Sequence, residues 1–595
     1  MNESNLELIK LNVIINALQS ISEEMGVALT RAAYSTNIKD RKDCSCAIYN
    51  IEGDMIAQGE FMPIHLGVMP FALKEILKDI SISELSPGDI IINNDPYRMG
   101  SHLWDVMVFA PVFYEENPVA IVGNIAHHVD IGGTSGVTFE IFEEGMRIPP
   151  IKIVNKGEVQ KDILNLILTN VRTPKEVKGD LMAQFGAINR GRIGLKELSE
   201  KFGVEKLSRY FDKILNYSER MMREALKEIP DGEAEFFDFI KVEQTPSLFT
   251  GQLEEPKLEK YKNVRNLIRI QTKIKKVNSD LYIDFNGSGN CFDGINAPWS
   301  ITLSATYYAV KAVVAPRTPT NSGSYRCIHV NRPKGNSILN ATYPYAVRGC
   351  TSNPSQRIAD VIIGAFAQLV PKKASACHHD WPVLMINGMN PEKGRYYSFV
   401  ETYAGGLGAK YNEDGIDAAQ SHMSNTRNAP AEAIEQEYPL KVEEYSLVPN
   451  TEGAGKFRGG LGIRRRIKLL IDSHVLAKVQ RNKLKPYGLF GGLSGHKAQV
   501  GIITPDGKTT KGLPFYIRVT KMGTQIIIES SGGGGWGNPL ERDIELVKRD
   551  VINGLISPDR AYKIYGVKID PITYTVDYEE TNKIRKELLN KQVKI

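Results

Sequence analysis

The sequence predicts an α+β protein of several domains, with mixed antiparallel sheets, helical layers, a β-rich C-terminal part and a helical tail. At 595 residues the chain is too long for one hydrophobic core. Helix-like and strand-like spacings of apolar residues alternate along most of it, and a glycine-rich β pattern follows. We therefore divide the chain into an N-terminal domain, a central α/β domain, a β-rich and glycine-rich region, and a helical tail: 1–240, 241–442, 443–540 and 541–595.

The N-terminal part alternates between helices and short strands. Apolar residues at helical spacing predict these helices: 5–34, 64–77 and a helical layer over 177–226. Alternating and β-branched runs predict these strands: 44–49 and 55–58, which form a hairpin, and 90–93. Cys44 and Cys46 fall on one face of their strand, where we expect buried thiols because residues two apart are poorly placed for a disulfide.

A second predicted hairpin brings distant polar residues together. Its strands cover 106–113 and 119–125, and the polar segment 114–118 with its proline forms the turn. In an antiparallel pair closed there, partner numbers sum to 232 or 233, so Asp105 lies opposite His127 or His128. His102 sits just outside the same end of the hairpin.

The rest of the chain is predicted from the same signals. We expect the following: loops over 227–262, a hairpin of 267–276 with 281–286, a helix at 358–369, β-rich structure after 443, and helices from 542 onward. Gly532–Gly535 favours a tight turn over an anion-binding loop. Glu452–Gly460 lacks the spacing of a phosphate-binding loop and is flanked by β-like runs.

Composition excludes several classes of function. The net charge is only +5, from 74 basic and 69 acidic residues, and no basic block carries interleaved aromatics, so we expect no nucleic-acid partner. The densest basic run, Arg464–Lys468, is predicted to be the exposed face of a strand. No stretch is apolar and long enough to span a membrane, and no signal peptide is evident. Six scattered cysteines without a CxxC pair suit reduced thiols in the cytoplasm.

The histidines and aspartates around the second hairpin are the main candidate for chemistry. Two imidazoles, from His102 and from either His127 or His128, combine with the Asp105 carboxylate into a set that suits zinc, manganese or iron. Three protein ligands leave positions for water or substrate. The alternative is that these histidines bond buried backbone carbonyls. Because strand side chains alternate, only one of His127 and His128 faces the metal, and the pattern leaves that choice open. This hypothesis makes 1–240 a metal-binding catalytic domain.

Two further clusters offer weaker signals. Asp43 lies beside cationic residues and could stay ionised as a general base, although an ordinary turn aspartate gives the same pattern. The His378–Asp380 cluster could assist near a substrate, but a buried structural role is favoured. Serine, cysteine and lysine nucleophiles have no supporting motif.

The chain resembles the hydantoinase B/oxoprolinase family, whose members include B subunits of ATP-dependent hydantoinases and lactamases and large subunits of acetone and acetophenone carboxylases. The resemblance covers nearly the whole chain and rests on the following motifs: 43–49, 63–67, 94–97, 126–133, 144–150, 170–172, 423–428, 453–460 and the glycine run ending at 536–539. The chain departs from the common pattern at Met99, Trp104 and Ser530–Ser531.

The resemblance implies roles for individual residues. It places a divalent metal on His102, Asp105 and His127, and so favours His127 over His128. It makes Asp43 a catalytic acid or base. The remaining polar residues of the window become candidates for supporting or turn positions: Asp95, His128 and Asp130. Trp104, beside the site, is expected to shape the substrate pocket.

The resemblance also implies a partner and a two-step reaction. An ATP-binding hydantoinase A-type subunit, in an A2B2 heterotetramer, would bind ATP and magnesium and phosphorylate a carbonyl oxygen. This chain would then hydrolyse the activated lactam or hydantoin, acting within a hydantoinase, 5-oxoprolinase or lactamase. One alternative is the large subunit of an acetone- or acetophenone-type carboxylase, which acts on a ketone, and the chain is shorter than expected for it. A second alternative is a non-catalytic assembly subunit.

Overall fold

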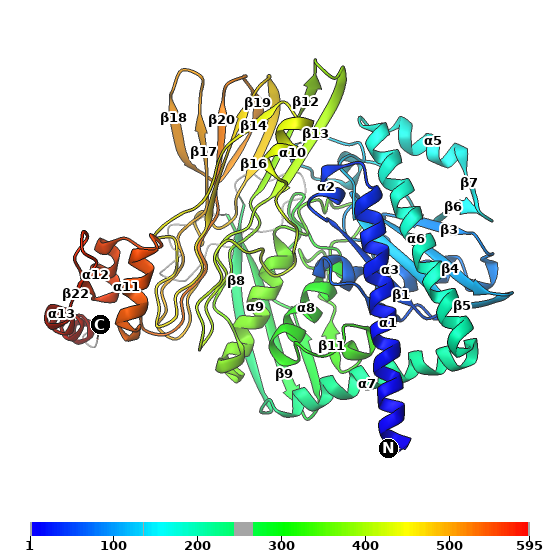
Figure 1. Ribbon diagram of the computed structural model, residues 1–595, viewed down its shortest axis with the longest axis horizontal. Coiled ribbons are helices and arrows are strands. Elements are labelled where there is room, and N and C mark those ends of the chain that lie inside the picture. The colour runs from blue at the N-terminus through cyan, green and yellow to red at the C-terminus, as the bar shows by residue number, and fades with distance from the viewer. Residues whose placement is uncertain (1–2, 135, 243–265, 593–595) are drawn as a thin grey trace.

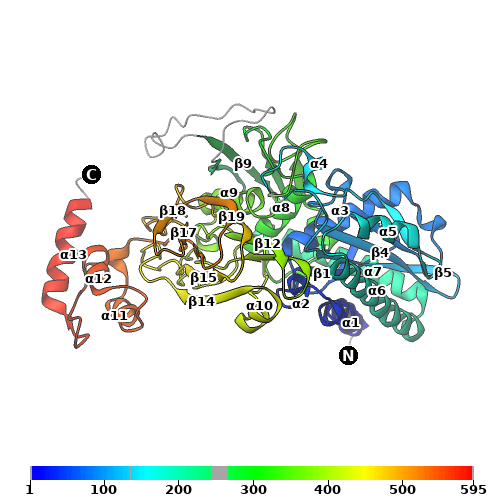
Figure 2. The ribbon, with the colours of Figure 1, turned by 90° about the horizontal axis from the view of Figure 1, so that it is seen from above.

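A computed structural model describes residues 3–134, 136–242 and 266–592. Figure 1 shows a broad body formed by the N-terminal and central parts, with a β-rich region above it and a helical tail to one side. Figure 2 shows the same parts from above, with the tail at the end away from the N-terminus. The predicted α+β class with antiparallel sheets and helical layers is confirmed.

A seven-stranded antiparallel sheet organises the N-terminal part. Its order is β2-β1-β5-β4-β3-β6-β7. The strands are β1 Cys44–Tyr49, β2 Met55–Gln58, β3 Ile90–Asn93, β4 Asp105–Tyr114, β5 Asn117–His127, β6 Ile151–Asn155 and β7 Glu158–Val159. The predicted bounds of β1, β2 and β3 are therefore confirmed.

The β4–β5 hairpin has one of the two predicted registers. Asp105 pairs with His127, so the partner numbers sum to 232 at the open end. The predicted five-residue turn is wrong, because the strands continue to Tyr114 and Asn117 and leave a two-residue turn. Glu115 in this turn adopts a positive φ of 55°. A register shift at Val112 and Phe113 lets Pro118 join the strand despite its missing N–H.

Helices cover both faces of this sheet. On one face lie α1 Glu3–Ala32, α6 Pro174–Phe202 and α7 Val204–Lys227, and on the other lie α3 Pro63–Asp79 and α8 Trp299–Val314. The side chains of β1 alternate between the two cores, with Cys44 and Cys46 in the first and Ala47 in the second. Both thiols are buried and unpaired, as predicted.

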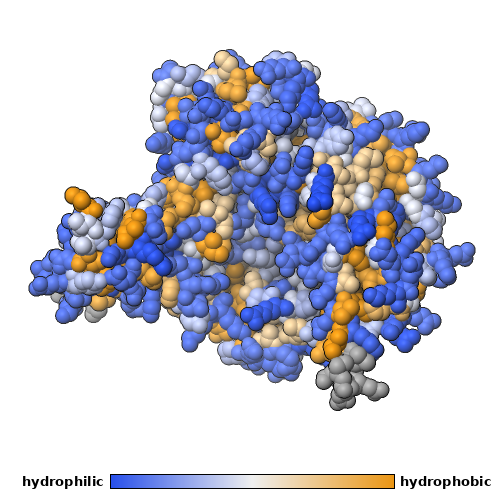
Figure 3. Space-filling view, in the orientation of Figure 1, coloured by the Kyte–Doolittle hydropathy of each residue, from blue (hydrophilic) through white to orange (hydrophobic). Residues whose placement is uncertain are grey.

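The N-terminal helix has the predicted length but lies two residues earlier than predicted. It ends at Ala32, and the short helix α2 (Thr36–Lys39) begins after Ser35, whose hydroxyl caps it. Figure 3 shows apolar side chains exposed along α1. They include Leu8, Ile9 and Val13, which are about half exposed. Short helices α4 Ile141–Glu144 and α5 Lys161–Thr169 complete this part.

A four-stranded sheet joins the N-terminal and central parts. Its order is β11-β10-β9-β8, with bounds β8 Gly232–Lys241, β9 Leu267–Val277, β10 Asp280–Asp284 and β11 Ile328–Asn331. The prediction of loops over 227–262 is wrong at 232–241, where β8 forms a ten-residue ladder with β9. Positions 243–262 of that prediction lie outside the described residues. The helix α9 (Pro354–Leu369) packs on this sheet, and its core is continuous with that of α3 and α8.

The β-rich region contains two further antiparallel sheets. Their orders are β13-β12-β16-β19 and β14-β15-β20-β17-β18. The strands are β12 Val383–Asn390, β13 Arg395–Thr402, β14 Leu440–Leu447, β15 Ile463–Leu469, β16 Ser473–Lys478, β17 Gln499–Ile503, β18 Thr509–Leu513, β19 Phe515–Thr520 and β20 Gln525–Glu529, with the helix α10 Ala431–Glu437 beside them. The basic run in β15 is not wholly exposed: Arg465 is buried, with its Nε 3.6 Å from Glu401 Oε2.

Extended glycine-rich segments pack side by side below these sheets. The prediction of a tight turn at Gly532–Gly535 is wrong, because none of these four glycines has a positive φ. Instead, a Cβ on Gly532 would lie 1.8 Å from Thr451 O, and one on Gly533 would lie 2.0 Å from Leu407 O. Backbone hydrogen bonds such as Gly533 N–H to Gly460 O, at 2.9 Å, join the segments. Glycine is therefore required by close approach of backbones.

The tail is helical, as predicted. Its helices are α11 Ile544–Ile552, α12 Pro558–Tyr565 and α13 Tyr578–Gln592, with a small sheet of β21 Lys568–Ile569 and β22 Val576–Asp577. Ser557 caps α12, and Pro558 occupies its first position. Among the described residues, no helix combines the length and apolar character needed to cross a bilayer.

Candidate metal centre and its cavity

His102, Asp105 and His127 converge at the open end of the β4–β5 hairpin. One ligand atom from each lies within 4.8 Å of the others. Asp105 begins β4 and His127 ends β5, so their pairing in the ladder holds them together. His102 lies three residues earlier, with Nε2 3.6 Å from Asp105 Oδ2. The two imidazole rings meet edge to face, with centroids 5.0 Å apart.

Both imidazoles are oriented through Nδ1. The backbone N–H of Trp104 donates to His102 Nδ1 at 3.2 Å. Asn37, on α2, places its amide nitrogen 3.1 Å from His127 Nδ1 and donates to the His127 carbonyl at 2.8 Å. Arg41 in turn donates to the Asn37 side-chain oxygen, which fixes the amide. Nε2 of each ring is therefore the nitrogen left for a ligand.

The charge state of the centre suits a cation. Burial alone would raise the pKa of Asp105, but the imidazoles of His102 and His65 outweigh it and hold that pKa far below its usual range. Burial lowers the pKa of His102 to about 4, so this ring is neutral near pH 7. Asp105 Oδ1 is buried and lies 3.3 Å from His65 Nε2, whereas Ser101 donates to Oδ2.

These donors fit a divalent cation of the zinc, manganese or iron type, since two imidazoles and one buried carboxylate converge. One adjustment is required. Both Nδ1 atoms face N–H donors, and this arrangement matches the tautomer with the proton on Nε2. A cation at Nε2 would move that proton to Nδ1 and displace the two hydrogen bonds described above.

His65 is a member of the centre that sequence reasoning missed. It lies in the first turn of α3, is buried, and places Nε2 3.3 Å from Asp105 Oδ1 and 3.9 Å from Asp43 Oδ1. Burial opposes its protonation, but the two carboxylates overcome this and raise its pKa. His65 falls within a motif of the family resemblance, 63–67, but its closeness to Asp105 depends on packing of α3 against the sheet.

Asp43 lies where a catalytic acid or base could act. It immediately precedes β1, which pairs with β5, and its backbone carbonyl accepts from the N–H of His127 at 3.0 Å. The side chain is buried, faces His65 and lines the cavity described below. The catalytic role predicted for Asp43 stays a prediction, but its position suits that role.

The other residues of the predicted window have structural contacts. His128 points away, and its Nε2 lies 2.9 Å from the side-chain oxygen of Gln184. Asp130 accepts from the backbone N–H groups of Gly132 and Thr173, each at 2.9 Å. Asp95 caps a short 3-10 helix by accepting from the N–H of Tyr97. These contacts favour the turn interpretation for both aspartates.

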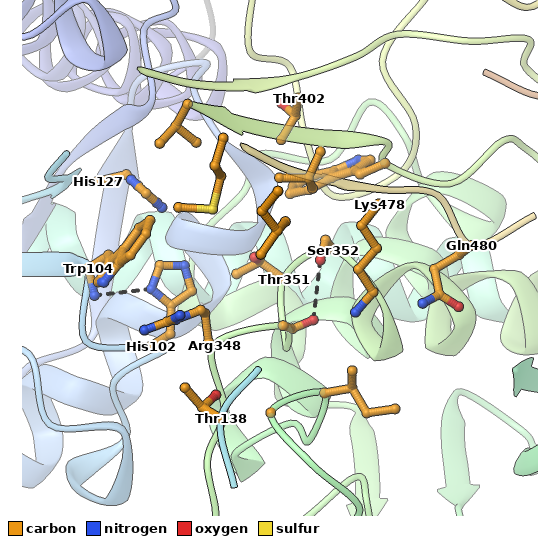
Figure 4. A pocket seen from close by; sticks show the side chains of 18 of the residues that line it. His102, Trp104, His127, Thr138, Arg348, Thr351, Ser352, Thr402, Lys478 and Gln480 are labelled. Carbon is orange, nitrogen blue, oxygen red and sulfur yellow. Dashed lines mark hydrogen bonds between the residues drawn. The ribbon is translucent and has the colours of Figure 1, made fainter. Parts of the chain in front are cut away.

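A cavity of about 180 Å³ opens beside the centre. Figure 4 shows His102, His127 and Trp104 on one side of it, and Lys478 and Gln480 on the other. Arg348 lies at the histidine side, with its guanidinium carbon 5.3 Å from the centroid of a Trp104 ring. Trp104 therefore forms part of the wall, as expected, and orders a cation next to the site.

The His378–Asp380 cluster has a different environment. His378 stacks on His422, with centroids 3.9 Å apart, and His422 Nε2 lies 3.1 Å from Asp360 Oδ1. Arg481 donates to Asp360 at 2.6 Å, and Arg357 donates to Asp380 at 3.0 Å. These buried ion pairs join α9 to the segment that follows β16. The contacts favour the structural role predicted for this cluster.

Comparisons with known proteins find relatives over nearly the whole chain. A family model described as hydantoinase B/oxoprolinase matches residues 7–539. A relative from a Pseudomonas species, named as the B subunit of a putative D-/L-hydantoinase, is 32% identical over 601 residues, covering 98% of each chain.

Two solved structures share the fold. The crystal structure of ATP-dependent caprolactamase from Pseudomonas jessenii has a TM-score of 0.84 and 28% identity, covering 97% of this chain and 99% of that one. A nucleotide-free acetone carboxylase has a TM-score of 0.89, covering 99% of this chain and 83% of that one. At 17% identity the second likeness concerns the fold alone.

Proposed function

Because this chain belongs to the hydantoinase B/oxoprolinase family, we propose that it is the hydrolytic subunit of an ATP-dependent cyclic amidohydrolase of hydantoinase, 5-oxoprolinase or lactamase type. The observation that carries the proposal is the convergence of two imidazoles and one carboxylate at a strand end, on the wall of a cavity. Family members that include hydantoinase and caprolactamase support hydrolysis of an amide C–N bond.

His102, Asp105 and His127 would hold a divalent cation. When bound there, zinc, manganese or iron would supply Lewis acidity toward an oxygen of the substrate. The surrounding residues prepare the ligands for this role. Ser101 and His65 orient Asp105, while Asn37 holds His127 by donating to its backbone carbonyl.

Asp43 would be the acid and base of hydrolysis. It takes a proton from the attacking water as the new C–O bond forms, and returns it to the ring nitrogen as the C–N bond breaks. His65 lies between Asp43 and Asp105 and holds a proton there, which disperses the charge of two neighbouring carboxylates. If the carbonyl oxygen carries a phosphate, the product is an acyl phosphate, and a second water converts it to carboxylate and inorganic phosphate.

Arg348 would assist this chemistry at the same end of the cavity. Its side chain donates to the Gly136 carbonyl at 3.1 Å, and it stacks near Trp104. Its Nε has no hydrogen-bond partner among the described residues. A phosphate on the activated carbonyl would bind this guanidinium, because the planar set of N–H groups on arginine matches phosphate oxygens.

The ATP-dependent step belongs to a partner in this proposal. An unstrained amide is a poor electrophile, so converting its oxygen to a phosphate ester removes the resonance that protects it. The phosphate-loop spacing is absent from Glu452–Gly460, and one relative carries the name of a hydantoinase B subunit. We therefore propose an ATP- and magnesium-binding subunit of hydantoinase A type as the partner, in an A2B2 heterotetramer.

The test uses the complex of this chain with the product of a neighbouring gene that encodes an ATP-binding subunit. ATP consumption and products are measured on hydantoins, 5-oxoproline, lactams and ketones, with and without bicarbonate. We expect phosphate release with a ring-opened product, independent of bicarbonate. A carboxylated product that requires bicarbonate would overturn hydrolysis in favour of the carboxylase alternative.

Variants of the centre separate catalysis from assembly. His65→Gln keeps the size and polarity of the side chain but cannot be protonated, and we expect it to lower kcat about 10-fold to 100-fold. Co-purification with the partner and the thermal unfolding temperature serve as controls. Full activity in both His65→Gln and Asp43→Asn would instead indicate an assembly subunit without catalysis.

A further inference from the structure

Lys478 is a cation placed inside the cavity, away from the metal centre. It is the last residue of β16, and Figure 4 shows its side chain extending into the cavity from the side opposite His102 and His127. Neither the proposed cation site nor the proposed acid and base uses it. Its position therefore calls for a separate explanation.

The charge of Lys478 is not matched by an ion pair. Among the described residues, no carboxylate oxygen lies within 4.0 Å of its Nζ. Its polar contact is with the side-chain amide of Asn353, which accepts from Nζ at 3.2 Å when its oxygen faces the lysine. A neutral acceptor leaves two N–H groups and the charge of the ammonium without a protein partner.

Asp293 lines the same cavity and, with Asp380, is one of two carboxylates that act on Lys478 from beyond ion-pair distance. Its Oδ1 has no hydrogen-bond partner among the described residues, and burial raises its pKa. Burial also lowers the pKa of Lys478, and Asp293 partly offsets this from beyond ion-pair distance. The two groups face one cavity without contact, so Lys478 remains open to a ligand.

Gln480 adds a second polar group at this end. Only 9% of its surface is exposed, and its amide oxygen has no hydrogen-bond partner among the described residues. Figure 4 shows Gln480 beside Lys478 at the cavity. The ammonium of Lys478 matches an anionic oxygen of a ligand, and the unpartnered oxygen of Gln480 matches an N–H or O–H donor of the same ligand. Burying such groups without partners is costly, which favours a site that a ligand completes.

We propose that Lys478 binds an anionic oxygen group of the substrate, and that the substrate is a cyclic amide bearing a carboxylate. This rests on the proposed function for the position of the reacting carbonyl, which must lie beside His102, Asp105 and His127. A phosphate on that carbonyl would also lie at the histidine side, near Arg348. The group at Lys478 is therefore a substituent on the far side of the ring, for which a carboxylate is the fitting chemistry.

The test measures binding, so that it does not depend on turnover. Purified full chain is titrated by calorimetry with matched ligands that differ in one carboxylate: 5-oxoproline against 2-pyrrolidone, and hydantoin-5-acetate against 5-propylhydantoin. We expect Lys478→Met to weaken at least one acid about 10-fold to 100-fold, because a charge-assisted hydrogen bond is lost. The neutral ligands should change less than about 3-fold, because they make no such bond.

Two further variants control for folding and charge. Lys478→Arg keeps the cation and should retain most of the affinity for the acid. Lys508→Met removes an exposed lysine from the turn between β17 and β18 and should bind like the wild type. Equal weakening of acids and neutral ligands in Lys478→Met, or no measurable binding of any acid at millimolar concentration, would overturn the proposal.

Inorganic phosphate distinguishes the source of the anion. If Lys478→Met weakens phosphate binding but leaves the acids unchanged, the residue binds the activated carbonyl's phosphate and the carboxylate assignment is overturned. The outcomes also separate this inference from the proposed function. If the wild-type complex hydrolyses neutral lactams but Lys478→Met binds the acids normally, the Lys478 proposal fails and the proposed hydrolysis stands. If Lys478→Met selectively loses acid binding but the wild-type complex turns over no substrate, the Lys478 site stands and the proposed hydrolysis is unsupported.

Discussion

The chain contains two buried clusters of histidine and aspartate, and they differ in what surrounds the carboxylates. At the hairpin end, Asp105 contacts the imidazoles of His65 and His102 and the hydroxyl of Ser101. Around α9, Asp360 and Asp380 bind the guanidinium groups of Arg357 and Arg481. The first cluster lines a cavity, whereas the second joins packed elements.

This difference shows how the same residue types serve different purposes. A carboxylate already bound by arginine has its charge compensated and its lone pairs occupied, so it offers little to a cation. A carboxylate that contacts imidazoles and a hydroxyl, and no guanidinium, retains its capacity as a ligand. Histidine and aspartate in the sequence therefore indicated two candidate sites. The arginines bound to Asp360 and Asp380 show that the second cluster is the poorer site for a cation.

The largest expected effect tests the first cluster. Asp105→Asn preserves the shape of the side chain but removes its charge, and we expect it to lower kcat of the complex by about 10³-fold or more, since loss of a charged ligand costs several kcal/mol. Metal content, measured by mass spectrometry after dialysis, should fall in parallel. Unchanged metal content in Asp105→Asn would contradict the assignment of this ligand.

The matching change in the second cluster should affect stability instead. Arg357→Met leaves Asp360 and Asp380 with one guanidinium fewer in a buried site, and we expect the free energy of unfolding to fall by about 3–5 kcal/mol. Denaturant unfolding followed by fluorescence measures this. Metal content per folded chain should stay at the wild-type value, and its loss would show that the two clusters are coupled.

The smallest expected effect concerns pH. Burial raises the pKa of Asp380 to about 7, despite its contact with Arg357. The pKa of Asp380 in the folded protein lies above the ordinary aspartate value. The protonated Asp380 carboxyl therefore contributes most to the free energy of unfolding below about pH 4, and this contribution is lost as pH rises through 7. We expect the unfolding temperature of the wild type to fall between pH 5 and pH 8 by roughly 1–3 °C more than that of Asp380→Asn. Parallel pH profiles for the two proteins would refute this.

Local sequence predicted the features that depend on one hairpin. The two β-rich runs limited the partner of Asp105 to His127 or His128, and the structure selects His127. His65 could not be placed in this way. Its distance to Asp105 depends on α3 packing against the sheet, and the helix pattern only says that the residue is buried.

Long-range packing explains the other missed features. Arg465 was expected on an exposed face, but Glu401 from β13 lies beneath it as a buried partner. The β8 strand carries too many charged residues for a clear β pattern and is fixed by its ladder with β9. Lys478 became a candidate only when the cavity placed it across from the histidines.

The glycine-rich segments have a consequence for engineering this protein. Their backbones touch, so even a methyl group at Gly406 would lie 1.9 Å from Gly460 O. Random mutagenesis aimed at a new substrate would therefore lose many variants at positions remote from the cavity. A library would concentrate its diversity on productive positions if it left the following segments unchanged: 403–416, 451–462, 485–495 and 530–537.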